Sequence, residues 1–444
     1  MHDPRSRDAQ ARARLLRGRR LSLHAPTVDA DIERAMRRRI AILAIVLLAG
    51  CTDRSTPTAT RAGAPAAQDQ TGVIQGKPAD TRPMMPTNAL DVDTTPVLAR
   101  IEAMVTSSLA AVPIPPDAFS QASDAVHPDV ACAPAAWNGS RCWATYTPYL
   151  GSNAMVENPS FLVARTEVQW ATPPGVTNPV VPSPAGGGYN SDPDQAFDPG
   201  TNRLVTFYRE VSGGFNKIYV MSTGDGQRWT VPQLAFEEPN HNAVSPAVVI
   251  GADRVARMWY VETGGGCGTS QSRVHLRTAQ PTPDQTFEQA AWSPASDVDL
   301  VQPGSVIWHM DVIALPRRHG YLALMASYAP GNDCASDDVW LAISHNGTSW
   351  RTFPVPVIWR GMARAKQLGI RTWYRSTMRY DADTDTLHIW PSALTMGNKW
   401  GVYHAAVDLS DLMRALLAAK PADRPAAALR MPSLVPYELR QRMP

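Results

Sequence analysis

The sequence predicts an all-β protein, a five-bladed β-propeller with a short N-terminal helix and a disordered N-terminal tether. The first observation is the segment 189–210, YNSDPDQAFDPGTNRLVTFYRE, in which polar residues, a strand, an Asp-Pro-Gly turn and a second strand follow one another. The second is that looser copies recur, 53 residues apart from Pro193 to Pro246, 65 from Pro246 to Asp311 and 66 from Asp311 to Thr377. Repeats of this length are typical of propeller blades. A β-sandwich or jelly roll is the alternative, but it does not explain polar residues at the head of each repeat.

Composition and charge argue against nucleic acid as a partner. The chain has 444 residues, 44% of them hydrophobic, and a formal net charge of +2. A nucleic-acid-binding domain usually carries a basic excess, which this chain lacks overall. Arginines do crowd the first 39 residues, but an export signal preceded by extra residues explains them better. We expect a monomer.

The N-terminal region contains an export signal. An apolar run at 40–48 follows the basic stretch 36–39 and is too short to span a bilayer. It ends in Leu-Ala-Gly-Cys51, which resembles the lipobox of bacterial lipoproteins and implies cleavage before Cys51 and lipidation of that residue. Residues 1–51 are then an N-terminal extension and lipoprotein signal peptide, although an ordinary signal peptide or an uncleaved anchor would also fit. Thr52 in place of an aspartate favours the outer membrane of a bacterial cell envelope.

The remaining segments follow in order. Residues 52–95 are rich in Thr, Ala, Pro, Asp and Gln, and this composition predicts a disordered linker. Residues 96–116 read as a short helix and a Pro-rich connection, because apolar residues recur at helical spacing until the prolines begin. The propeller is expected over 117–408. Residues 409–444 read as an amphipathic helix followed by a tail.

The cysteines suit an oxidising compartment. Once Cys51 is set aside, four remain, and Cys132 and Cys142 are close enough in sequence to pair. Cys267 and Cys334 lie in loop-like segments, where a disulfide would tie neighbouring blades together. Their spacing does not predict a metal site. We therefore predict no cofactor, although the carboxylates described below leave a structural Ca²⁺ open.

The heads of the repeats supply the candidate site, because the innermost strand of each propeller blade starts near the central channel. We interpret Glu157, Asp192 and Asp311 as catalytic residues. The predicted substrate-binding residues are Asp194, Ser245, His309 and Arg375. Carboxylates in one cavity shift the pKa of one another, and acid–base cleavage of a glycosidic bond requires such a separation.

Structural roles for the same residues are also open. Asp192 or Asp194 would then cap a turn or hold a blade opening by accepting from backbone N–H groups. His309 would be a core histidine, and Glu157 would form an ion pair with Arg375 across the channel. The first repeat, with Glu157 at its head, is shorter than the others, and we expect it to borrow strands to close the ring.

A family resemblance rests on three strings and two turns. The strings are ENPSFLVA at 157–164, NSDPDQAFDP at 190–199 and WHMDVI at 308–313, and the turns are those at 222–229 and 344–350. They resemble the blade openings and turns of five-bladed glycoside hydrolases of the family 43 and 32 kind. The resemblance implies a carboxylate from the first blade as base or nucleophile, which would be Glu157. It implies an aspartate from the second blade as orienter, which would be Asp192.

One position departs from that family. Its general-acid glutamate lies at the head of the third blade, where this chain has Ser245. A serine hydroxyl does not protonate a leaving group near neutral pH, so Glu210, His241 or Asp311 would have to supply the proton. The sequence therefore predicts a glycoside hydrolase-like lipoprotein that acts on or binds polysaccharide. The alternative is a non-catalytic surface propeller that binds glycan or a protein partner.

Overall fold

The structure is a computed structural model. It describes residues 96–115, 124–266, 269, 271–316, 318, 320–330, 336 and 338–419. All described residues belong to the unit 85–444. The predictions for the signal peptide, Cys51, the linker, the C-terminal tail, Cys267 and Cys334 therefore lie outside the described residues.

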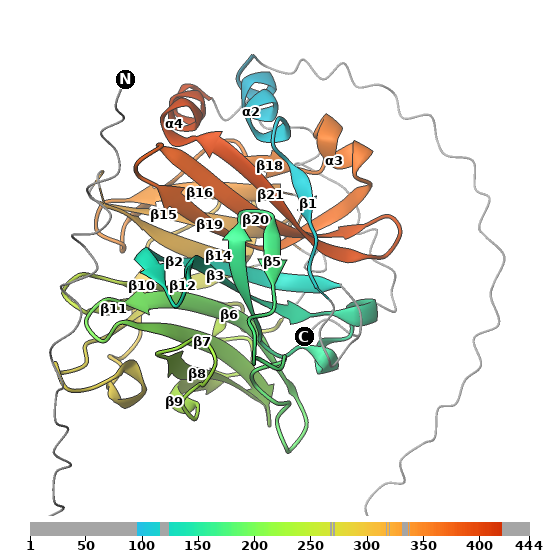
Figure 1. Ribbon diagram of the computed structural model, residues 1–444. Helices are drawn as coiled ribbons and strands as arrows, with labels where there is room; N and C mark the ends of the chain where they lie inside the picture. The colour runs from blue at the N-terminus through green and yellow to red at the C-terminus, as the bar shows by residue number, and fades with distance from the viewer. Residues whose placement is uncertain are drawn as a thin grey trace, which may run out of the picture. The chain divides into compact units, whose positions relative to one another are not determined.

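Five small antiparallel sheets form the five blades of a propeller, as predicted (Figure 1). In the first four blades the strands follow one another along the chain. Blade 1 consists of β2 (Ala125–Trp137), β3 (Ser140–Pro148), β4 (Ser160–Thr166) and β5 (Gln169–Ala171). Blade 2 consists of β6 (Tyr189–Asp198), β7 (Arg203–Ser212), β8 (Phe215–Thr223) and β9 (Gln233–Pro239). Blade 3 consists of β10 (Val244–Ile250), β11 (Ala256–Glu262), β12 (Arg273–Ala279) and β13 (Ser296–Val298). Blade 4 consists of β14 (Val306–Leu315), β15 (Gly320–Tyr328), β16 (Asp338–Ser344) and β17 (Trp350–Thr352), with β18 (Ile358–Trp359) paired to β16.

The fifth blade is completed by a strand from the other end of the domain. Its chain-continuous strands are β19 (Ile370–Asp381), β20 (Thr386–Thr395) and β21 (Trp400–Asp408), and β1 (Ala110–Val112) pairs antiparallel with β21. The ring is thus closed by the segment before the first blade. We expected the first blade to borrow strands, and this was wrong: blade 1 is complete, and blade 5 borrows β1. The propeller sheets accordingly begin at Ala110, ahead of the predicted boundary.

Two helices cover one edge of the fifth blade. Figure 1 shows α2 (Pro96–Thr106) beside α4 (Leu409–Ala418). Their apolar faces share one core cluster with residues of blades 4 and 5; Leu98, Ile101 and Leu412 are buried in it. Asp408 caps α4, because its side chain accepts a hydrogen bond from Asp411 N. The amphipathic pattern therefore predicted both helices, but the first ends at Thr106 and not at the prolines, because Ala110–Val112 forms strand β1. The other helical elements are α3 (Ala363–Gln367) and the 3₁₀ turns η2 (Leu150–Ser152), η3 (Ala154–Val156) and η4 (Phe287–Gln289).

The two glycine turns resembling glycosidase turns are structural. Gly226 and Gly347 have φ angles of +69° and +79°, which glycine adopts at little cost. A Cβ atom would lie 2.8 Å from Trp143 at Gly226 and 2.7 Å from Trp259 at Gly347. Each turn therefore packs its backbone against a buried tryptophan.

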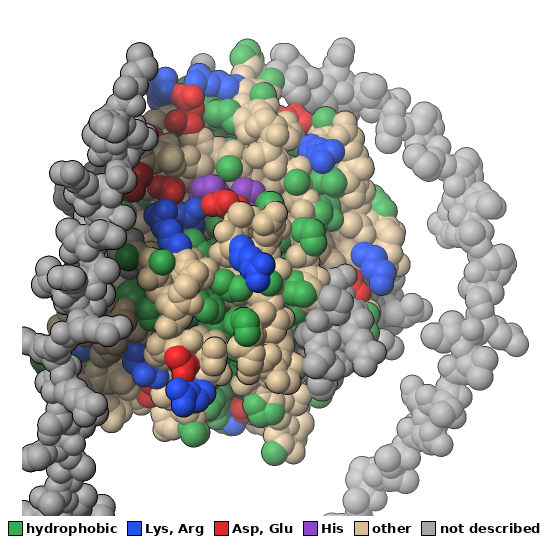
Figure 2. Space-filling view, viewed as in Figure 1, with side chains coloured by type: hydrophobic (Ala, Val, Ile, Leu, Met, Phe, Trp, Pro, Cys, Tyr) green, Lys and Arg blue, Asp and Glu red, His purple; other side chains and the backbone are tan. Residues whose placement is uncertain are grey.

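Cys132 and Cys142 form a disulfide, as predicted. They face each other on β2 and β3, with Cα atoms 4.0 Å apart. No helix within the described part of the chain has the length and apolar character needed to cross a membrane. On the face shown in Figure 2, described basic and acidic side chains are interspersed among apolar ones.

The inner strands position the site through a shared irregularity. Each of them, namely β2, β6, β10, β14 and β19, has a register shift near its start. At three of these shifts the residue has a positive φ angle: 50° at His127, 49° at Asp192 and 55° at Ser245. Such bulges re-aim a side chain, and a non-glycine residue in this conformation is energetically unfavourable. The blade openings therefore direct polar side chains into the centre of the propeller.

This alignment corrects the head of the first blade. The equivalent tripeptides are His127-Pro128-Asp129, Asp192-Pro193-Asp194, Ser245-Pro246-Ala247, His309-Met310-Asp311 and Arg375-Ser376-Thr377. Glu157 is not at the head of an inner strand, as we had placed it. It lies between η3 and β4, in the connection that follows β3.

Candidate functional site

Three buried aspartates link the blades to one another. Asp129 Oδ2 accepts from Gln195 N at 2.7 Å, and Asp194 Oδ1 accepts from Val248 N at 3.0 Å. Each carboxylate thus holds the backbone of the next blade. Asp311 does the same for blade 5, because its Oδ2 accepts from Met378 N at 2.8 Å. We call Asp129, Asp194 and Asp311 the aspartate ring.

Two side chains of blade 5 bond to the aspartate ring and form one layer of the propeller centre with it. The Thr377 hydroxyl lies 2.8 Å from Asp129 Oδ1 and 3.0 Å from Asp311 Oδ2. Arg375 Nη2 lies 3.3 Å from Asp194 Oδ2, and its Nε donates to Ser245 Oγ at 3.0 Å. Arg375 therefore pairs with Asp194, whereas we had considered Glu157 as its ion-pair partner.

The carboxyl groups of the aspartate ring all have raised pKa values. Burial, followed by the charge of Asp311, raises the pKa of Asp129 to about 7. Burial and the neighbouring Asp129 also raise the pKa of Asp194 well above its usual range. The three side chains lie close enough to hold a cation. However, all six carboxylate oxygens accept hydrogen bonds from protein donors, the sixth being Asp311 Oδ1 from Val312 N at 2.7 Å. This layer is therefore satisfied by the protein itself.

A second group lies at the first position of the same tripeptides. His127 Nε2 is 3.4 Å from Asp192 Oδ1, and His309 Nδ1 is 3.6 Å from the same oxygen. One ligand atom from each residue lies within 4.8 Å of the others. All three side chains are at most 1% exposed. We call these residues the His-Asp-His group.

The facing atoms of the His-Asp-His group lack hydrogen-bond partners. Among the described residues, none bonds to His127 Nε2, to Asp192 Oδ1 or to either ring nitrogen of His309. Buried polar atoms are nearly always paired in native structures, and each unpaired one is costly. Their convergence on one point therefore indicates a site for a further group.

The surroundings leave the facing atoms available. Glu157 Oε2 lies 2.9 Å from His127 Nδ1 and accepts from Thr147 Oγ1 at 3.1 Å. A carboxylate at Nδ1 favours the tautomer in which Nε2 carries a lone pair. Asp192 Oδ2 is 3.1 Å from Arg209 Nε and accepts from Ser245 N at 3.2 Å, which leaves Oδ1 free.

Burial and neighbouring charges shift the pKa values of His309, Asp192 and Glu157. Burial lowers the pKa of His309 well below its usual value, so its ring is neutral near pH 7. Burial alone would raise the pKa of Asp192, but the charge of the neighbouring Arg209 guanidinium opposes this effect, and the pKa is lowered. Burial raises the pKa of Glu157 despite the opposing effect of His127. The result is a neutral His309 imidazole facing an ionised Asp192 carboxylate.

Two imidazoles and one carboxylate form a donor set that suits a divalent first-row metal ion with open coordination positions. The unpaired lone pairs on this set fit such an ion, and the carboxylate beside His127 is the kind of outer partner that metal-binding histidines usually have. We had assigned no metal ligands from the sequence.

Aromatic rings line the neighbourhood of this group. Tyr374 lies against His309 edge to face, with ring centroids 4.5 Å apart. Tyr149 stacks parallel to Tyr374 at 6.4 Å, and Trp400 is 5.2 Å from each of these two rings. All three rings are buried in one core cluster, so they form an apolar wall beside His309.

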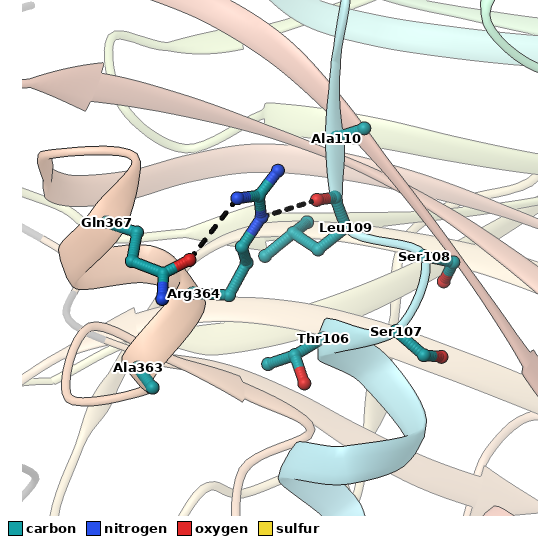
Figure 3. A pocket seen from close by; sticks show the side chains of 8 residues that line it. All are labelled: Thr106, Ser107, Ser108, Leu109, Ala110, Ala363, Arg364 and Gln367. Atoms are coloured by element: carbon teal, nitrogen blue, oxygen red, sulfur yellow. Dashed lines mark hydrogen bonds between the residues drawn. The ribbon is translucent and has the colours of Figure 1, made fainter.

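A surface pocket elsewhere lacks comparable chemistry. Figure 3 shows a cavity of about 430 Å³ between the end of α2 and helix α3. Arg364 Nε donates to Leu109 O at 3.1 Å there, and its Nη1 donates to Gln367 Oε1 at 3.3 Å. Its lining contains no histidine, cysteine or carboxylate. We therefore place the candidate site at the His-Asp-His group.

All seven predicted site residues are buried at the centre, in two layers. Glu157, Asp192 and His309 belong to the layer of the His-Asp-His group, and Asp194, Asp311 and Arg375 to that of the aspartate ring. Ser245 joins the two layers. Of the alternative proton donors, Glu210 forms an ion pair with Lys217 at 3.2 Å, and His241 lies beside Trp308 at 6.3 Å between ring centroids.

Sequence reasoning missed His127, Asp129, Arg209 and Thr377. A signal for the first two was present, because His127-Pro128-Asp129 has the same X-Pro-X form as the heads of blades 2 and 3. Arg209 carried no such signal. Its place beside Asp192 follows from the register of β6 and β7, in which Ser191 faces Arg209.

The chain matches no protein-family model. It is 23% identical over 314 residues to an A type blood N-acetyl-alpha-D-galactosamine deacetylase of Flavonifractor plautii. The match covers 60% of this chain and 40% of that relative, so the chain spans well under half of the relative's length.

Solved structures share the fold. An N-acetylgalactosamine deacetylase from F. plautii, crystallised in complex with blood group B trisaccharide, superposes with a TM-score of 0.61 at 21% identity and covers 70% of this chain and 97% of that one. A thermostable family-43 glycoside hydrolase gives a TM-score of 0.45 at 13% identity, with coverage of 64% and 88%. At 21% identity, the likeness to the deacetylase structure shows the fold alone.

Proposed function

We propose that this protein is a metal-dependent carbohydrate deacylase that removes the acetyl group from an N-acetylated amino sugar. The observation that carries the proposal is the convergence of unpaired atoms from His127, Asp192 and His309. The name of the F. plautii relative supports the substrate class. We also propose that the protein is a monomeric lipoprotein, held at the outer membrane of a bacterial cell envelope through Cys51.

Deacylation fits the site better than glycoside hydrolysis does. A glycosidase needs two carboxyl groups free to act on the glycosidic bond. Here the oxygens of the aspartate ring accept hydrogen bonds from the protein, and the head of blade 3 offers Ser245 and Ala247 in place of an acid. A hydrolytic metal site needs two or three ligands and one nearby carboxyl group, and the second layer supplies all of them.

The reaction adds water to the amide carbonyl carbon, breaks its C–N bond and yields acetate and a free amine. A divalent cation held by the His-Asp-His group would polarise the carbonyl and lower the pKa of a water molecule. Glu157 fixes the His127 ring, and its raised pKa equips it to take up a proton during the reaction. Arg209 and Ser245 N hold Asp192 with Oδ1 facing the imidazoles.

Acetate release from oligosaccharides ending in N-acetylgalactosamine or N-acetylglucosamine tests the proposal. We expect the full chain to release acetate and an equal amount of free amine, with the glycosidic bonds intact. His309→Leu should abolish release because it removes a proposed metal ligand. It breaks no side-chain hydrogen bond, since neither ring nitrogen of His309 has a partner among the described residues. His388→Asn, in a histidine pair on blade 5, is the matched control.

Chelation and the products separate the outcomes. A chelator should stop release by the wild-type chain, and Zn²⁺ or Mn²⁺ should restore it. Release of reducing sugar without acetate would show a glycosidase instead. Oligosaccharide binding without any product would show the non-catalytic alternative.

A further inference from the structure

Three buried donors beside the His-Asp-His group remain unused by the mechanism above. They are Arg209 Nη1 and the hydroxyl groups of Tyr149 and Tyr189, and none has a hydrogen-bond partner among the described residues. Arg209 is 1% exposed, Tyr149 0% and Tyr189 6%. Native structures rarely leave so many buried donors unpaired in one place.

These donors belong to one neighbourhood. Arg209 Nε is 3.0 Å from Ser191 Oγ and 3.1 Å from Asp192 Oδ2, so the free end of the guanidinium lies next to the His-Asp-His group. Tyr149 and Tyr189 belong to one buried cluster with Tyr374, whose ring packs against His309 with centroids 4.5 Å apart. Burial keeps the pKa of each phenol above its usual value, so both hydroxyl groups remain donors.

The chemistry of this set suits one kind of ligand group. A guanidinium presents planar N–H groups that match a carboxylate, and two hydroxyl donors can complete its hydrogen bonds. Asp192 is the one carboxylate within ion-pair distance of Arg209 among the described residues, and its other oxygen faces the imidazoles. A second anion would therefore find donors here without displacing an existing bond.

We propose that Arg209, Tyr149 and Tyr189 form a carboxylate-binding subsite beside the His-Asp-His group. The proposal rests on the proposed function for the identity of the carboxylate. It is either the acid released by deacylation or a carboxylate carried by the sugar, as in a uronic acid. Both present the same planar anion to the three donors.

Ligand titration of the full chain tests the subsite without turnover. Acetate and galacturonate are each titrated into chelator-treated protein, and binding is followed by ligand-observed NMR. We expect Tyr149→Phe and Tyr189→Phe each to weaken binding about tenfold, because each removes one hydrogen bond to a charged group. Tyr208→Phe, on β7 beside Arg209, is the control and should bind like the wild type.

The outcomes are distinct. Acetate binding without galacturonate binding identifies the released acid, and the reverse identifies a carboxylate on the sugar. Binding of neither ligand, or unchanged binding in both phenylalanine variants, would overturn the subsite. Because no metal is present, loss of acetate release in the previous experiment leaves this result intact, and the failures of the two proposals can be told apart.

Discussion

The Ser245 hydroxyl should contribute several kcal/mol to the unfolding free energy. The five-bladed glycoside hydrolases that the sequence resembles carry a catalytic acid at this position. The Ser245 hydroxyl donates to Met310 O at 3.0 Å and accepts from Met310 N at 3.2 Å and from Arg375 Nε at 3.0 Å. All three partners are buried. Ser245→Ala therefore leaves a buried amide N–H and a buried guanidinium N–H unpaired. At about 1–3 kcal/mol for each of these two donors, the variant should lose roughly 2–6 kcal/mol of unfolding free energy.

The backbone at Ser245 offers an internal check. Its φ angle of 55° is unfavourable for serine and alanine alike, whereas glycine adopts it freely. Ser245→Gly loses the same hydroxyl but should be about 1 kcal/mol more stable than Ser245→Ala. Urea unfolding of the full chain measures both differences.

An exposed serine provides the control. Ser107→Ala removes an exposed hydroxyl bonded to Met104 O and should change stability by less than about 0.5 kcal/mol. If Ser245→Ala unfolds within about 0.5 kcal/mol of the wild type, the hydroxyl does not join the two layers as described, and the reasoning fails.

Three further predictions concern other parts of the chain. Burial and the neighbouring His388 lower the pKa of His404 from 6.5 to about 4. The folded state thus takes up a proton less readily than the unfolded chain, and stability should fall by about 1–2 kcal/mol as the pH drops through this window; His404→Gln should flatten the slope in urea titrations. Cys51→Ala should abolish fatty-acid labelling and leave the membrane fraction. Non-reduced digests should contain Cys267 linked to Cys334 when analysed by mass spectrometry.

The fold was predictable because local sequence features repeat once in each blade. Polar heads, short strands and glycine turns recur every 53 to 66 residues, and each marks a blade without reference to the others. Closure of the ring was not predictable in the same way. Strand β1 has three residues and pairs with β21 nearly 300 positions later, so no local pattern connects them.

The site was predictable in part, for a physical reason. Asp192 and His309 could be placed near each other because they head inner strands, and the fold brings those heads together. Glu157 was placed wrongly at the head of an inner strand, because it reaches His127 from the connection after β3. The two layers differ in role because the carboxylate oxygens of the aspartate ring accept hydrogen bonds from protein donors, whereas Asp192 Oδ1 does not. Asp194 holds the N–H of Val248 on the next blade, and this is a property of the folded ring alone.

The metal content of the full chain tests the central claim most directly. Protein loaded with Zn²⁺ or Mn²⁺ and dialysed is analysed by inductively coupled plasma mass spectrometry, for the wild type, His309→Leu and His388→Asn. The account predicts one tightly held ion per chain in the wild type and in His388→Asn, and none in His309→Leu. A wild-type chain that retains no ion, or a His309→Leu chain that retains as much as the wild type, would contradict it.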